Sequence, residues 1–573
     1  MPRANDAVEA ALLEYADLLS ILTKDPYRPR SYEKAARAVG GYPADLAGLD
    51  RTQILKIPNV GASIAEKIEE FLASGTFAAL EELREQIPPG VREMTEVPGL
   101  GPKKAMLLFQ DLGIADVQQL GEALDAGRLA GVKGFGAKTE EKIRRGIQRM
   151  QQTGGRVISS VAMDVAEYLL ERLGGRRDVR RIEYAGSLRR MAETIGDLDL
   201  LVASDEPTEV MEAFTTVGIV ERVLAKGDTK SSVLSRTGLQ IDLRVLPLEA
   251  WGAAMIYFTG SKPHNIRIRE MAVRKGLKLN EYGLFDAKSG ELIVARTEEE
   301  VYERLGLPWI PPTLREDRGE VEAALEGTLP DVLTRTQVRG DLHTHTNLTD
   351  GLATLGQMLE TASALGYAYY AVTDHAPNLA MQRMTDEKML AQREEVRSLQ
   401  GRFPKMTLLH GTELNIDGEG EVDWGPEFLE GFDICVASVH SLFRQSKDEM
   451  TRRIIRAMEN PYVHVIGHPT GRKINQREPI EFDLDAVFEA AARTGTALEV
   501  NGYPDRLDLK DEHILWARRH GVKFAVDTDS HATTHLDLMR YGVATAQRGW
   551  LTKDDVINAW PLSKLRRFLR KGR

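Results

Sequence analysis

The chain has 573 residues, and because a single hydrophobic core stops growing near about 250–300 residues, we expect three or more domains. Charged residues make up 28% of the chain and the formal net charge is −11, which excludes a generic, uniformly basic nucleic-acid binder. Any contact with DNA must therefore come from local patches or from backbone amides.

The sequence contains one cysteine, Cys435, which lies in the apolar run GFDICVASVH. A single cysteine excludes an internal disulfide framework and predicts a reducing, cytoplasmic setting. Acidic residues near the N-terminus stand where a signal peptide needs an apolar core, and no stretch approaches the roughly 18 apolar residues of a membrane span. We therefore expect a cytoplasmic protein without membrane segments.

The first 150 residues have helical patterns broken by short glycine turns. Residues 57–68, 97–108 and 132–143 repeat one pattern: an apolar residue, a tight turn that ends in glycine, and an amphipathic helix. Amides at such a helix N-terminus can bind a phosphate without side-chain charge, which is a sequence-independent way to hold a nucleic-acid backbone. The alternative is that glycine only ends the turns between helices, but three copies favour phosphate binding. The glycines concerned are Gly61, Gly99, Gly101, Gly134 and Gly136.

Two local signals refine these helices. Ser63 and Glu66 have the spacing of a capping box, so the sequence predicts a capped helix start there. Pro102 suits the first turn of the second hairpin helix.

Residues 156–245 have a mixed α/β pattern, with strands expected in RRIEYAG, DLDLLVA and QIDLRVLP. Asp197 and Asp199 are two apart in one strand and so share a face, and Asp242 lies within another strand. Aspartate is depleted in strands, and three carboxylates would repel one another unless cations lie between them. A solvated strand face is the alternative, but the pattern favours two Mg²⁺ or Mn²⁺ ions about 3.5–4 Å apart, as in phosphoryl transfer.

The turn before these aspartates adds groups that bind phosphate. Gly186 and Ser187 offer backbone amides and a hydroxyl, and Arg190 offers a guanidinium, which together suit a triphosphate.

After Val338, seven apolar runs alternate with helical patterns, which predicts a βα barrel. Nine residues with imidazole or carboxylate side chains lie mostly at the C-terminal ends of these runs, the end that carries the chemistry in such barrels: His343, His345, Asp350, His375, Glu413, His440, His468, Asp529 and His531. Such ligands suit Zn²⁺ or Mn²⁺, and nine exceed what one ion can use, so we expect two or three ions. His464 and Asp374 are candidates for supporting these ligands from behind.

The segment 186–202, with GS followed by GDLD, resembles the nucleotidyltransferase signature. Together with the hairpins it resembles the family X DNA polymerases, and the similarity covers about residues 1–312. The resemblance gives Asp197, Asp199 and Asp242 the catalytic role and implies a nucleotide-binding set: Gly186, Ser187, Arg190, Gly196, Tyr257, Phe258, Gly260, Ser261, Asn265 and Arg269.

Within that set, Tyr257 and Phe258 are expected to pack beside the sugar of the nucleotide. Asn265 and Arg269 are expected to face the base or the template minor groove. The sequence departs from the family pattern at Met191 and Ile195, which predicts weaker nucleotide binding, and at Lys262, in the nucleotide pocket.

In DNA polymerase beta, a lysine of the N-terminal helical domain forms a Schiff base with an abasic sugar. Lys67 matches the position of that lysine, although Ser63 stands where polymerase beta has a supporting lysine. A lysine nucleophile needs a depressed pKa, which neighbouring cations help to produce, so the loss of the supporting lysine weakens the case for a lyase. The alternative interpretation, which the sequence favours, is that Lys67 is an exposed helix cation.

The nine C-terminal residues resemble the ligand set of the polymerase-and-histidinol-phosphatase (PHP) domain, a distorted seven-stranded barrel with a trinuclear site. The resemblance implies one ion at His343, His345, Glu413 and Asp529, a second at Glu413, His440 and His468, and a third at Asp350, His375 and His531. A purely structural PHP domain should have apolar or amide side chains at some ligand positions. All nine positions here keep a metal-binding side chain, which argues against that alternative.

We therefore predict a multidomain protein with an all-α helix-hairpin-helix region, an α/β nucleotidyltransferase palm and a distorted (β/α)7 PHP barrel. The expected boundaries are 1–85 for a lyase-like helical domain, 86–153 for a helical DNA-binding subdomain, 154–245 for the palm, 246–312 for a nucleotide-pocket subdomain, 313–338 for a linker and 339–573 for the barrel.

The implied function is gap-filling DNA synthesis in repair, combined with metal-dependent cleavage at 3′ ends as an exonuclease, phosphatase or abasic-site endonuclease. The expected partners are gapped or primer-template DNA and deoxynucleoside triphosphates, and we expect a monomer. The alternatives are a 3′-end processing nuclease with a weak polymerase site, a non-catalytic DNA-bridging protein, and a small-molecule phosphatase, which would leave the hairpins without a purpose.

Overall fold

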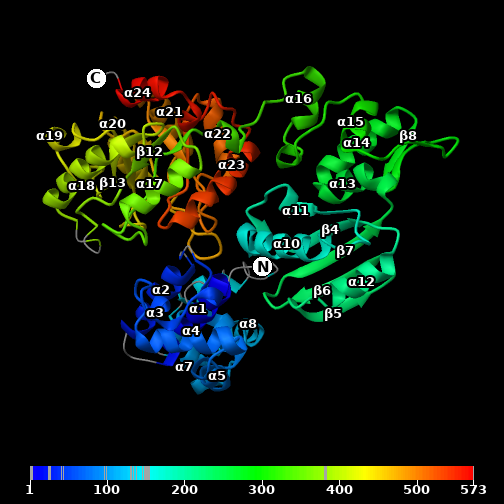
Figure 1. Cartoon of the computed structure of the whole chain (residues 1–573), viewed down its shortest axis with the longest axis horizontal. Coiled ribbons are helices and arrows are strands. Elements are labelled where there is room, and N and C mark those ends of the chain that lie inside the picture. Colours follow the sequence, from blue (N-terminus) through cyan, green and yellow to red (C-terminus); the bar gives the residue numbers. More distant parts are fainter. Residues whose placement is uncertain are drawn as a thin grey trace. The chain divides into compact units, whose positions relative to one another are not determined.

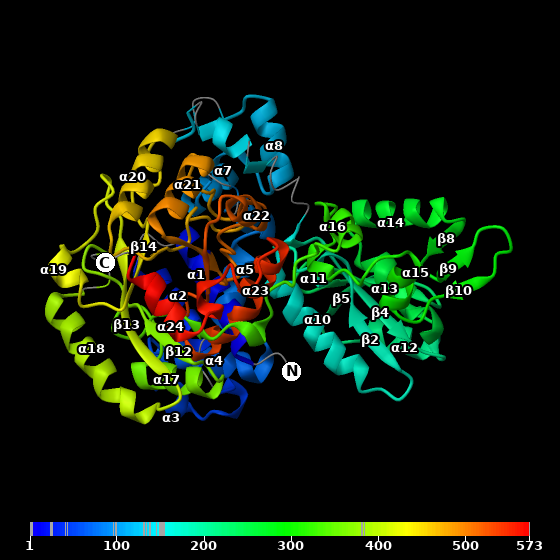
Figure 2. The same cartoon turned by 90° about the horizontal axis from the view of Figure 1, so that it is seen from above.

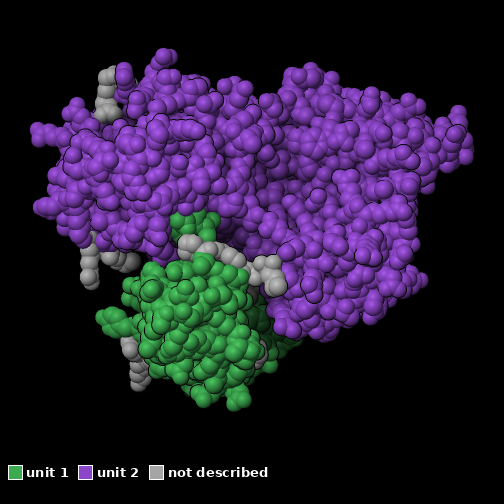
Figure 3. All heavy atoms as spheres, viewed as in Figure 1, with its two compact units in different colours: residues 1–155, 532–534 green, residues 156–531, 535–573 purple. Residues whose placement is uncertain are grey.

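The structure is a computed structural model, and it describes residues 4–571 except 23–26, 41, 43, 96, 98–99, 130–131, 133, 137–138, 145, 148–154, 380–381 and 383 (Figure 1). The chain forms two compact units, which Figure 3 colours separately. Residues 1–155, grouped with 532–534, make up the smaller unit, and the other residues make up the larger one. None of the described helices is both long and apolar enough to cross a lipid bilayer.

The smaller unit is entirely helical in its described residues. Its named helices are α1 (Ala4–Leu22), α2 (Tyr27–Gly40), α3 (Arg51–Ile54), α4 (Ala62–Ser74), α5 (Ala78–Gln86), α6 (Pro89–Thr95), α7 (Pro102–Leu112) and α8 (Val117–Asp125). Tyr15 of α1 is buried and packs edge-on against Tyr32 of α2 and Phe77, with ring centroids 4.7 and 5.2 Å apart. These aromatic contacts hold the first helices around one core.

The helices of the first two hairpins begin where the glycine pattern predicts, with one correction. Gly61 is the N-cap of α4 and Gly101 the N-cap of α7, which has Pro102 in its first turn as expected. Ser63 and Glu66 form no capping box, because the helix already begins at Ala62, one residue before Ser63. Asn59 replaces the usual glycine and has a φ of +62°, a left-handed conformation that asparagine tolerates better than most residues.

The palm of the larger unit is a five-stranded sheet with the order β2-β4-β7-β6-β5. Its strands are β2 (Arg181–Tyr184), β4 (Asp197–Ala203), β5 (Val220–Lys226), β6 (Lys230–Ser235) and β7 (Gln240–Leu246), and only β4 and β7 pair in parallel. Two short strands, β1 (Val157–Ile158) and β3 (Thr194–Ile195), pair beside it.

The alternation of side chains along β4 decides which way its aspartates point. Leu198 and Leu200 are fully buried in one core with residues of α10 (Ser159–Gly174) and α12 (Pro207–Thr215). Because neighbouring side chains in a strand point to opposite faces, Asp197 and Asp199 point away from that core. Burial of the leucines thus fixes the direction of the carboxylates.

Residues 251–332 form a second small core next to the palm. Its elements are α13 (Trp251–Thr259), α14 (Lys262–Arg274), α15 (Glu298–Arg304) and the antiparallel strands β8 (Leu277–Asn280), β9 (Gly283–Asp286) and β10 (Leu292–Val294). The segment expected to be a linker does contain the predicted short helix, α16 (Glu320–Glu326). This segment is also packed, since Leu314, Val321 and Val332 are buried in the same core.

The last part of the chain is a seven-stranded parallel sheet in the sequential order β11 to β17, confirming the predicted barrel (Figures 1 and 2). The strands are β11 (Gly340–Asp341), β12 (Tyr369–Val372), β13 (Thr407–Asn415), β14 (Ile434–Ser438), β15 (Val465–Ile466), β16 (Ala497–Asn501) and β17 (Phe524–Asp527). A parallel bridge between Thr344 and Ser530 brings the segment after the last strand beside the segment after the first.

Helices surround these strands, as Figure 2 shows from above. They are α17 (Leu355–Ala364), α18 (Asp386–Leu399), α19 (Pro426–Leu429), α20 (Lys447–Glu459), α21 (Leu484–Thr494), α22 (Asp511–Arg519), α23 (Met539–Arg548) and α24 (Leu562–Leu569). The strand residues contribute to three cores, one shared with helices such as α20 and α21, one with α17 and α18, and one with α24. The order of helical, mixed and barrel regions agrees with the predicted fold class.

A buried ionic cluster joins the palm to residues 251–332 and supplies a test of this packing. Arg189 donates two hydrogen bonds to Glu298, at 2.8 and 2.7 Å, and the fully buried Arg315 donates a third at 2.7 Å. Burial pushes the pKa of Glu298 up, but the two arginines outweigh it and lower this pKa to about 2. The pairing therefore stabilises the fold above the ordinary glutamate pKa and loses its effect as the pH falls toward 2.

We predict that Glu298→Gln lowers the free energy of unfolding by about 3 kcal/mol near neutral pH, because it leaves Arg315 buried without a counter-charge. Urea unfolding followed by circular dichroism measures the change, and Glu299→Gln, at an exposed position of the same helix, is the matched control. Equal stability of the two variants would contradict this account of the cluster.

Candidate active sites

The three aspartates predicted to bind metal lie on two adjacent strands of the palm. Asp199 of β4 is the direct register partner of Asp242 of β7, and Asp197 lies two residues earlier on the same face. Burial raises the pKa of Asp199, and the charges of Asp197 and Asp242 raise it further, to about 7. Crowded carboxylates of this kind are stabilised by divalent cations.

Asp242 has three further partners that the sequence did not reveal: Gln240, Lys230 and Ser232. Gln240 donates to its Oδ1 at 2.9 Å, and the ammonium of Lys230 lies 3.2 Å from its Oδ2. Burial raises the pKa of Asp242, but hydrogen bonds from Gln240, Ser232 and Lys230 outweigh it and lower the pKa. Lys230 was missed because only the pairing of β6 with β7 brings it to this carboxylate.

The ligand atoms of the three aspartates do not form a compact group. Among the described residues, groups of three or more candidate ligand atoms within 4.8 Å of one another occur only in the barrel. The fit of the palm site to cations therefore rests on the register pairing of Asp199 with Asp242, with Asp197 on the same face.

We call residues 186–190 the nucleotide turn. Gly186 begins the short helix α11 (Gly186–Arg189) with a φ of +61°, and a Cβ there would collide with Oδ2 of Asp199. Glycine is thus required both for the backbone conformation and for the close approach. Ser187 is partly buried, and a Cβ on Gly196 would lie 2.9 Å from Arg156 Nη1. The nucleotide turn therefore lies against Asp199.

The side chain of Arg190 is already engaged. Its Nε lies 3.0 Å from Oε1 of Glu316, and its Nη1 donates to the carbonyl of Thr259 at 2.5 Å. Thr259 immediately precedes Gly260, and a Cβ on Gly260 would lie 3.2 Å from Arg190 Nη1. The structure therefore joins the nucleotide turn to the segment predicted to hold the sugar and base.

That segment is partly open to solvent. Tyr257 is 39% exposed and packs edge-on against Phe258, with ring centroids 5.0 Å apart. Asn265 donates to the carbonyl of Tyr257 at 2.7 Å, and Ser261 caps α14. Arg269 is exposed on the same helix.

The nine predicted ligands of the barrel meet in one region at the C-terminal ends of the strands. Eight of the nine residues fall into three overlapping groups, and within each group the candidate ligand atoms lie within 4.8 Å of one another. The groups are His345, Asp350, His375 and His531; His343, His345 and Asp529; and His375, Glu413 and His440. The ninth residue, His468, joins through its Nε2, 3.1 Å from Oε1 of Glu413.

Glu413 lies at the centre of this cluster. His440 Nε2 is 3.1 Å from its Oε1, and His375 Nδ1 is 2.9 Å from its Oε2. Burial raises the pKa of Glu413, but the charges of His440, His375 and His343 outweigh burial and hold the pKa well below its usual range. An anionic carboxylate surrounded by imidazoles is a donor set suited to Zn²⁺ or Mn²⁺.

Several ring nitrogens of the cluster are buried without a well-aligned hydrogen bond, including His343 Nε2, His345 Nε2 and His375 Nδ1. Buried polar atoms are normally paired, because an unpaired one loses its hydration without compensation. Ring nitrogens that face shared carboxylates but make no hydrogen bond are suited to coordinate a metal ion.

Sequence reasoning missed the residues that orient these ligands. Glu499 Oε1 lies 2.6 Å from His343 Nδ1, and Asn415 Oδ1 lies 2.7 Å from His440 Nδ1. Asn501 donates to Oδ2 of Asp529 at 3.1 Å. Partners of this kind fix the tautomer and direction of metal ligands. Their signal was present as polar residues inside the buried runs TELN and ALEVN.

The two supporting residues predicted from sequence have different places. Asp374 accepts from the Thr346 amide at 2.8 Å and from Thr349, so it holds the segment that follows His345. His464 accepts from the backbone amide of Cys435 at 2.9 Å and belongs to none of the ligand groups. It therefore supports the packing of the barrel strands.

In the smaller unit, Gly61, Gly101 and Gly136 lie at exposed helix starts, and a Cβ on any of them would meet no atom within 4 Å. Gly134 has a φ of +92°, and Gly99 lies outside the described residues. Lys67 of α4 lies 5.7 and 5.8 Å from the ring centroids of Tyr15 and Tyr32.

Comparison with known proteins agrees with this arrangement. The chain is 34% identical over 551 residues to the "DNA polymerase/3′-5′ exonuclease PolX" of Bacillus subtilis, a match that covers 96% of each chain. This chain belongs to the bacterial PolX family, the family X DNA polymerases with a C-terminal PHP domain. It is also similar to rat DNA polymerase lambda, at 23% identity over 53% of this chain and 56% of the relative.

Individual regions match separate family models. Residues 3–77 match a helix-hairpin-helix domain, 91–149 a SAM-like helix-hairpin-helix tandem, 254–316 the DNA polymerase beta thumb, and 341–502 the PHP domain. A "probable phosphatase" of Thermoanaerobacter sp. is 29% identical over 40% of this chain and 94% of its own length. The domain boundaries proposed from sequence remain predictions.

We predict that Glu499→Gln lowers the affinity of the barrel for Mn²⁺ by about 10- to 100-fold, because His343 loses the carboxylate that orients it. Equilibrium dialysis with elemental analysis measures the affinity. Glu489→Gln, on an exposed face of α21, provides the control. An unchanged affinity in the Glu499 variant would show that this carboxylate has no part in metal binding.

Proposed function

We propose that this PolX-family chain is a gap-filling DNA polymerase that also cleaves phosphoesters at DNA 3′ ends in its PHP barrel. The observation that carries the proposal is the close approach of the nucleotide turn to Asp199, the register partner of Asp242, in a chain similar over nearly its full length to a polymerase/exonuclease. The cleavage activity is assigned to the nine-residue cluster in the barrel.

In the palm, Asp197, Asp199 and Asp242 would hold two Mg²⁺ or Mn²⁺ ions, and bound ions of this kind stabilise the attacking and leaving oxygens of phosphoryl transfer. The amides of Gly186 and Ser187 would bind the triphosphate, together with Arg190.

Around the nucleotide, Tyr257 and Phe258 would wall the sugar, while Asn265 and Arg269 face the base or the minor groove. The exposed helix starts at Gly61, Gly101 and Gly136 would hold the DNA backbone through their amides, and Gly99 and Gly134 would belong to the same turns.

In the barrel, the nine residues would hold up to three ions, Zn²⁺, Mn²⁺ or both, and such ions supply a bound water of lowered pKa for attack on phosphorus. The ligand side chains differ in exposure: Asp350 is 32% and His531 27% exposed, whereas His343 and His345 are fully buried. We assign the mouth of the site to Asp350 and His531, so a DNA 3′ end would enter from that side.

The chemistry of the two sites defines the remaining proposals. The substrates are gapped or primer-template DNA and deoxynucleoside triphosphates, and one site would clean the terminus that the other extends. We propose that the protein acts as a monomer in the cytoplasm, where its buried Cys435 stays reduced.

One observation favours a second candidate, a 3′-end nuclease with a weak polymerase site. The guanidinium of Arg190 is committed to Glu316 and to the carbonyl of Thr259, so it must be shared with an incoming triphosphate. Met191 and Ile195, which depart from the family pattern, point the same way.

A double dissociation tests the assignment of the two activities. We predict that Asp242→Ala lowers nucleotide incorporation on a gapped primer by at least about a hundredfold and leaves 3′ cleavage intact, because it removes only a palm carboxylate. His440→Ala should have the opposite effect. A labelled primer assayed with Mn²⁺ follows both reactions.

Asp228→Ala and His520→Ala are the matched controls, since both residues lie away from the two clusters. Loss of both activities in either active-site variant would contradict the separation of the sites. Failure of the wild-type chain to incorporate nucleotide with any divalent metal would favour the nuclease alternative.

The abasic-site lyase role proposed for Lys67 has its own test. We predict that borohydride traps the chain on DNA with an abasic site, and that Lys67→Ala abolishes trapping because the Schiff base needs this amine. Lys56→Ala, at an exposed position in the same unit, is the control. Unchanged trapping in the Lys67 variant would remove this lysine from the mechanism.

A further inference from the structure

The last residue of α23, Arg548, reaches from the barrel to the nucleotide turn of the palm. It is only 8% exposed. Its Nη1 donates to the carbonyl of Arg190 at 2.8 Å and to Oε1 of Glu316 at 2.7 Å. Its Nε donates to Oδ2 of Asp511 at 2.9 Å, which fixes the guanidinium to the barrel.

Glu316 is shared between two arginines, because Arg190 Nε lies 3.0 Å from the same Oε1 that accepts from Arg548. Burial raises the pKa of Glu316, but Arg548 and Arg190 outweigh it and keep this pKa low. Arg548 therefore acts on the nucleotide turn in two ways. It binds the main-chain carbonyl of Arg190 directly, and it also binds Glu316, the carboxylate that orients the side chain of Arg190.

The backbone just after this contact is strained. Met191 has a φ of +54°, a conformation that residues other than glycine seldom adopt and that persists only where the surroundings impose it. On one side of Met191, Arg548 holds the Arg190 carbonyl; on the other, Arg472 of the barrel donates to Glu193 at 2.8 Å. Contacts from the barrel thus flank the strained residue.

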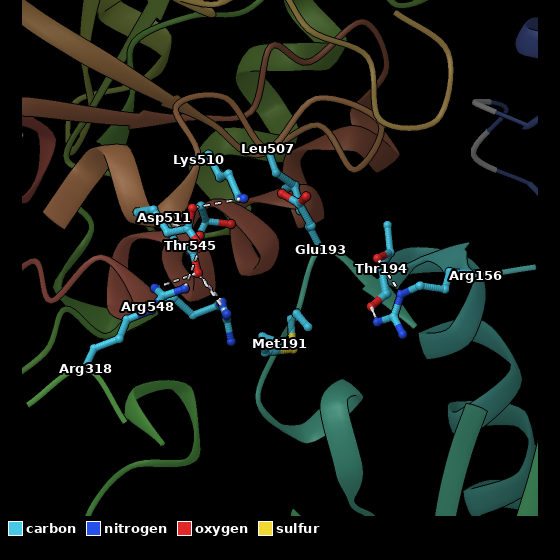
Figure 4. Close-up of a pocket in the computed structure, with 12 residues that line it drawn as sticks. Arg156, Met191, Glu193, Thr194, Arg318, Leu507, Lys510, Asp511, Thr545 and Arg548 are labelled. Carbon is cyan, nitrogen blue, oxygen red and sulfur yellow. Dashed lines mark hydrogen bonds and ion pairs between the residues drawn. The ribbon is translucent and has the colours of Figure 1, made fainter. Parts of the chain in front are cut away.

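A cavity of about 190 Å³ lies beside this contact. Met191, Glu193 and Thr194 line it from the palm, and Asp511, Thr545 and Arg548 line it from the barrel (Figure 4). Figure 4 shows Arg548 and Asp511 together on one side and Met191 near the centre of the view. Met191 packs against a core that includes Leu507 and Tyr541 of the barrel, and Arg548 adds polar contacts that hold the turn beside it.

We propose that Arg548 is a positioning residue for the polymerase reaction: the barrel, through this side chain, holds the nucleotide turn in the conformation that binds the triphosphate. The PHP domain would then support DNA synthesis structurally, independently of its own metal cluster. This inference rests on the proposed polymerase function of the palm.

The test measures nucleotide incorporation and 3′ cleavage by the full-length chain carrying Arg548→Ala. We expect KM for the nucleotide to rise about tenfold or more, the effect of losing a charge-assisted hydrogen bond, with a much smaller change in kcat. Cleavage in the barrel should stay at the wild-type level, since Arg548 belongs to none of the ligand groups.

Arg540→Ala is the matched control. Arg540 lies on the same helix and also reaches the palm, where it donates to Glu167 at 2.6 Å, but it contacts no part of the nucleotide turn. We expect its KM to equal that of the wild type. An equal rise in both variants would overturn the proposal, because it would show only loosened docking of the barrel on the palm.

Arg548→Lys is a second variant, for the case that Arg548→Ala does not fold. It keeps the buried positive charge and is therefore expected to fold. A single ammonium cannot reach the Arg190 carbonyl, Glu316 and Asp511 in the geometry of a guanidinium, so KM should still rise. An unchanged KM in this variant, with cleavage retained, would overturn the proposal. Absence of synthesis by the wild type and by Arg540→Ala would instead count against the polymerase function itself.

Discussion

The convergence of metal-binding side chains from segments far apart in the chain is the constraint on which both active sites depend. In the palm, burial of Leu198 and Leu200 forces Asp197 and Asp199 to the opposite face, where Asp242 joins them. In the barrel, parallel strands end at one edge and deliver carboxylates and imidazoles to it. Carboxylates in the palm, and carboxylates with imidazoles in the barrel, are donor sets suited to divalent cations, so we expect both sites to bind metal.

Much of this arrangement could be predicted from the sequence because the signals are local. The i, i+2 spacing of Asp197 and Asp199 fixes their common face, and the position of His375 or His440 after an apolar run places it at the functional end of the barrel. The hairpin glycines and Pro102 likewise report on helix starts through backbone chemistry alone. The capping box failed because the helix begins at Ala62, one residue before Ser63.

The rest could not be predicted, because it depends on contacts between residues far apart in the chain. Lys230 reaches Asp242 only through strand pairing, and Glu499 reaches His343 only when the barrel closes. The segment read as a linker is packed because its apolar residues fit a core formed mainly by residues 251–310. The contact of Arg548 with Arg190 spans 358 residues and carries no sequence motif, yet it joins the two catalytic parts of the larger unit.

Both active sites depend on divalent metal, and crystals of the full-length protein grown with Mn²⁺ test this most directly. Anomalous scattering at the manganese edge should give peaks beside Asp199 and Asp242 in the palm and within the group around Glu413 in the barrel. Peaks at other places, or none at either cluster while Mn²⁺ is present in excess, would contradict the account.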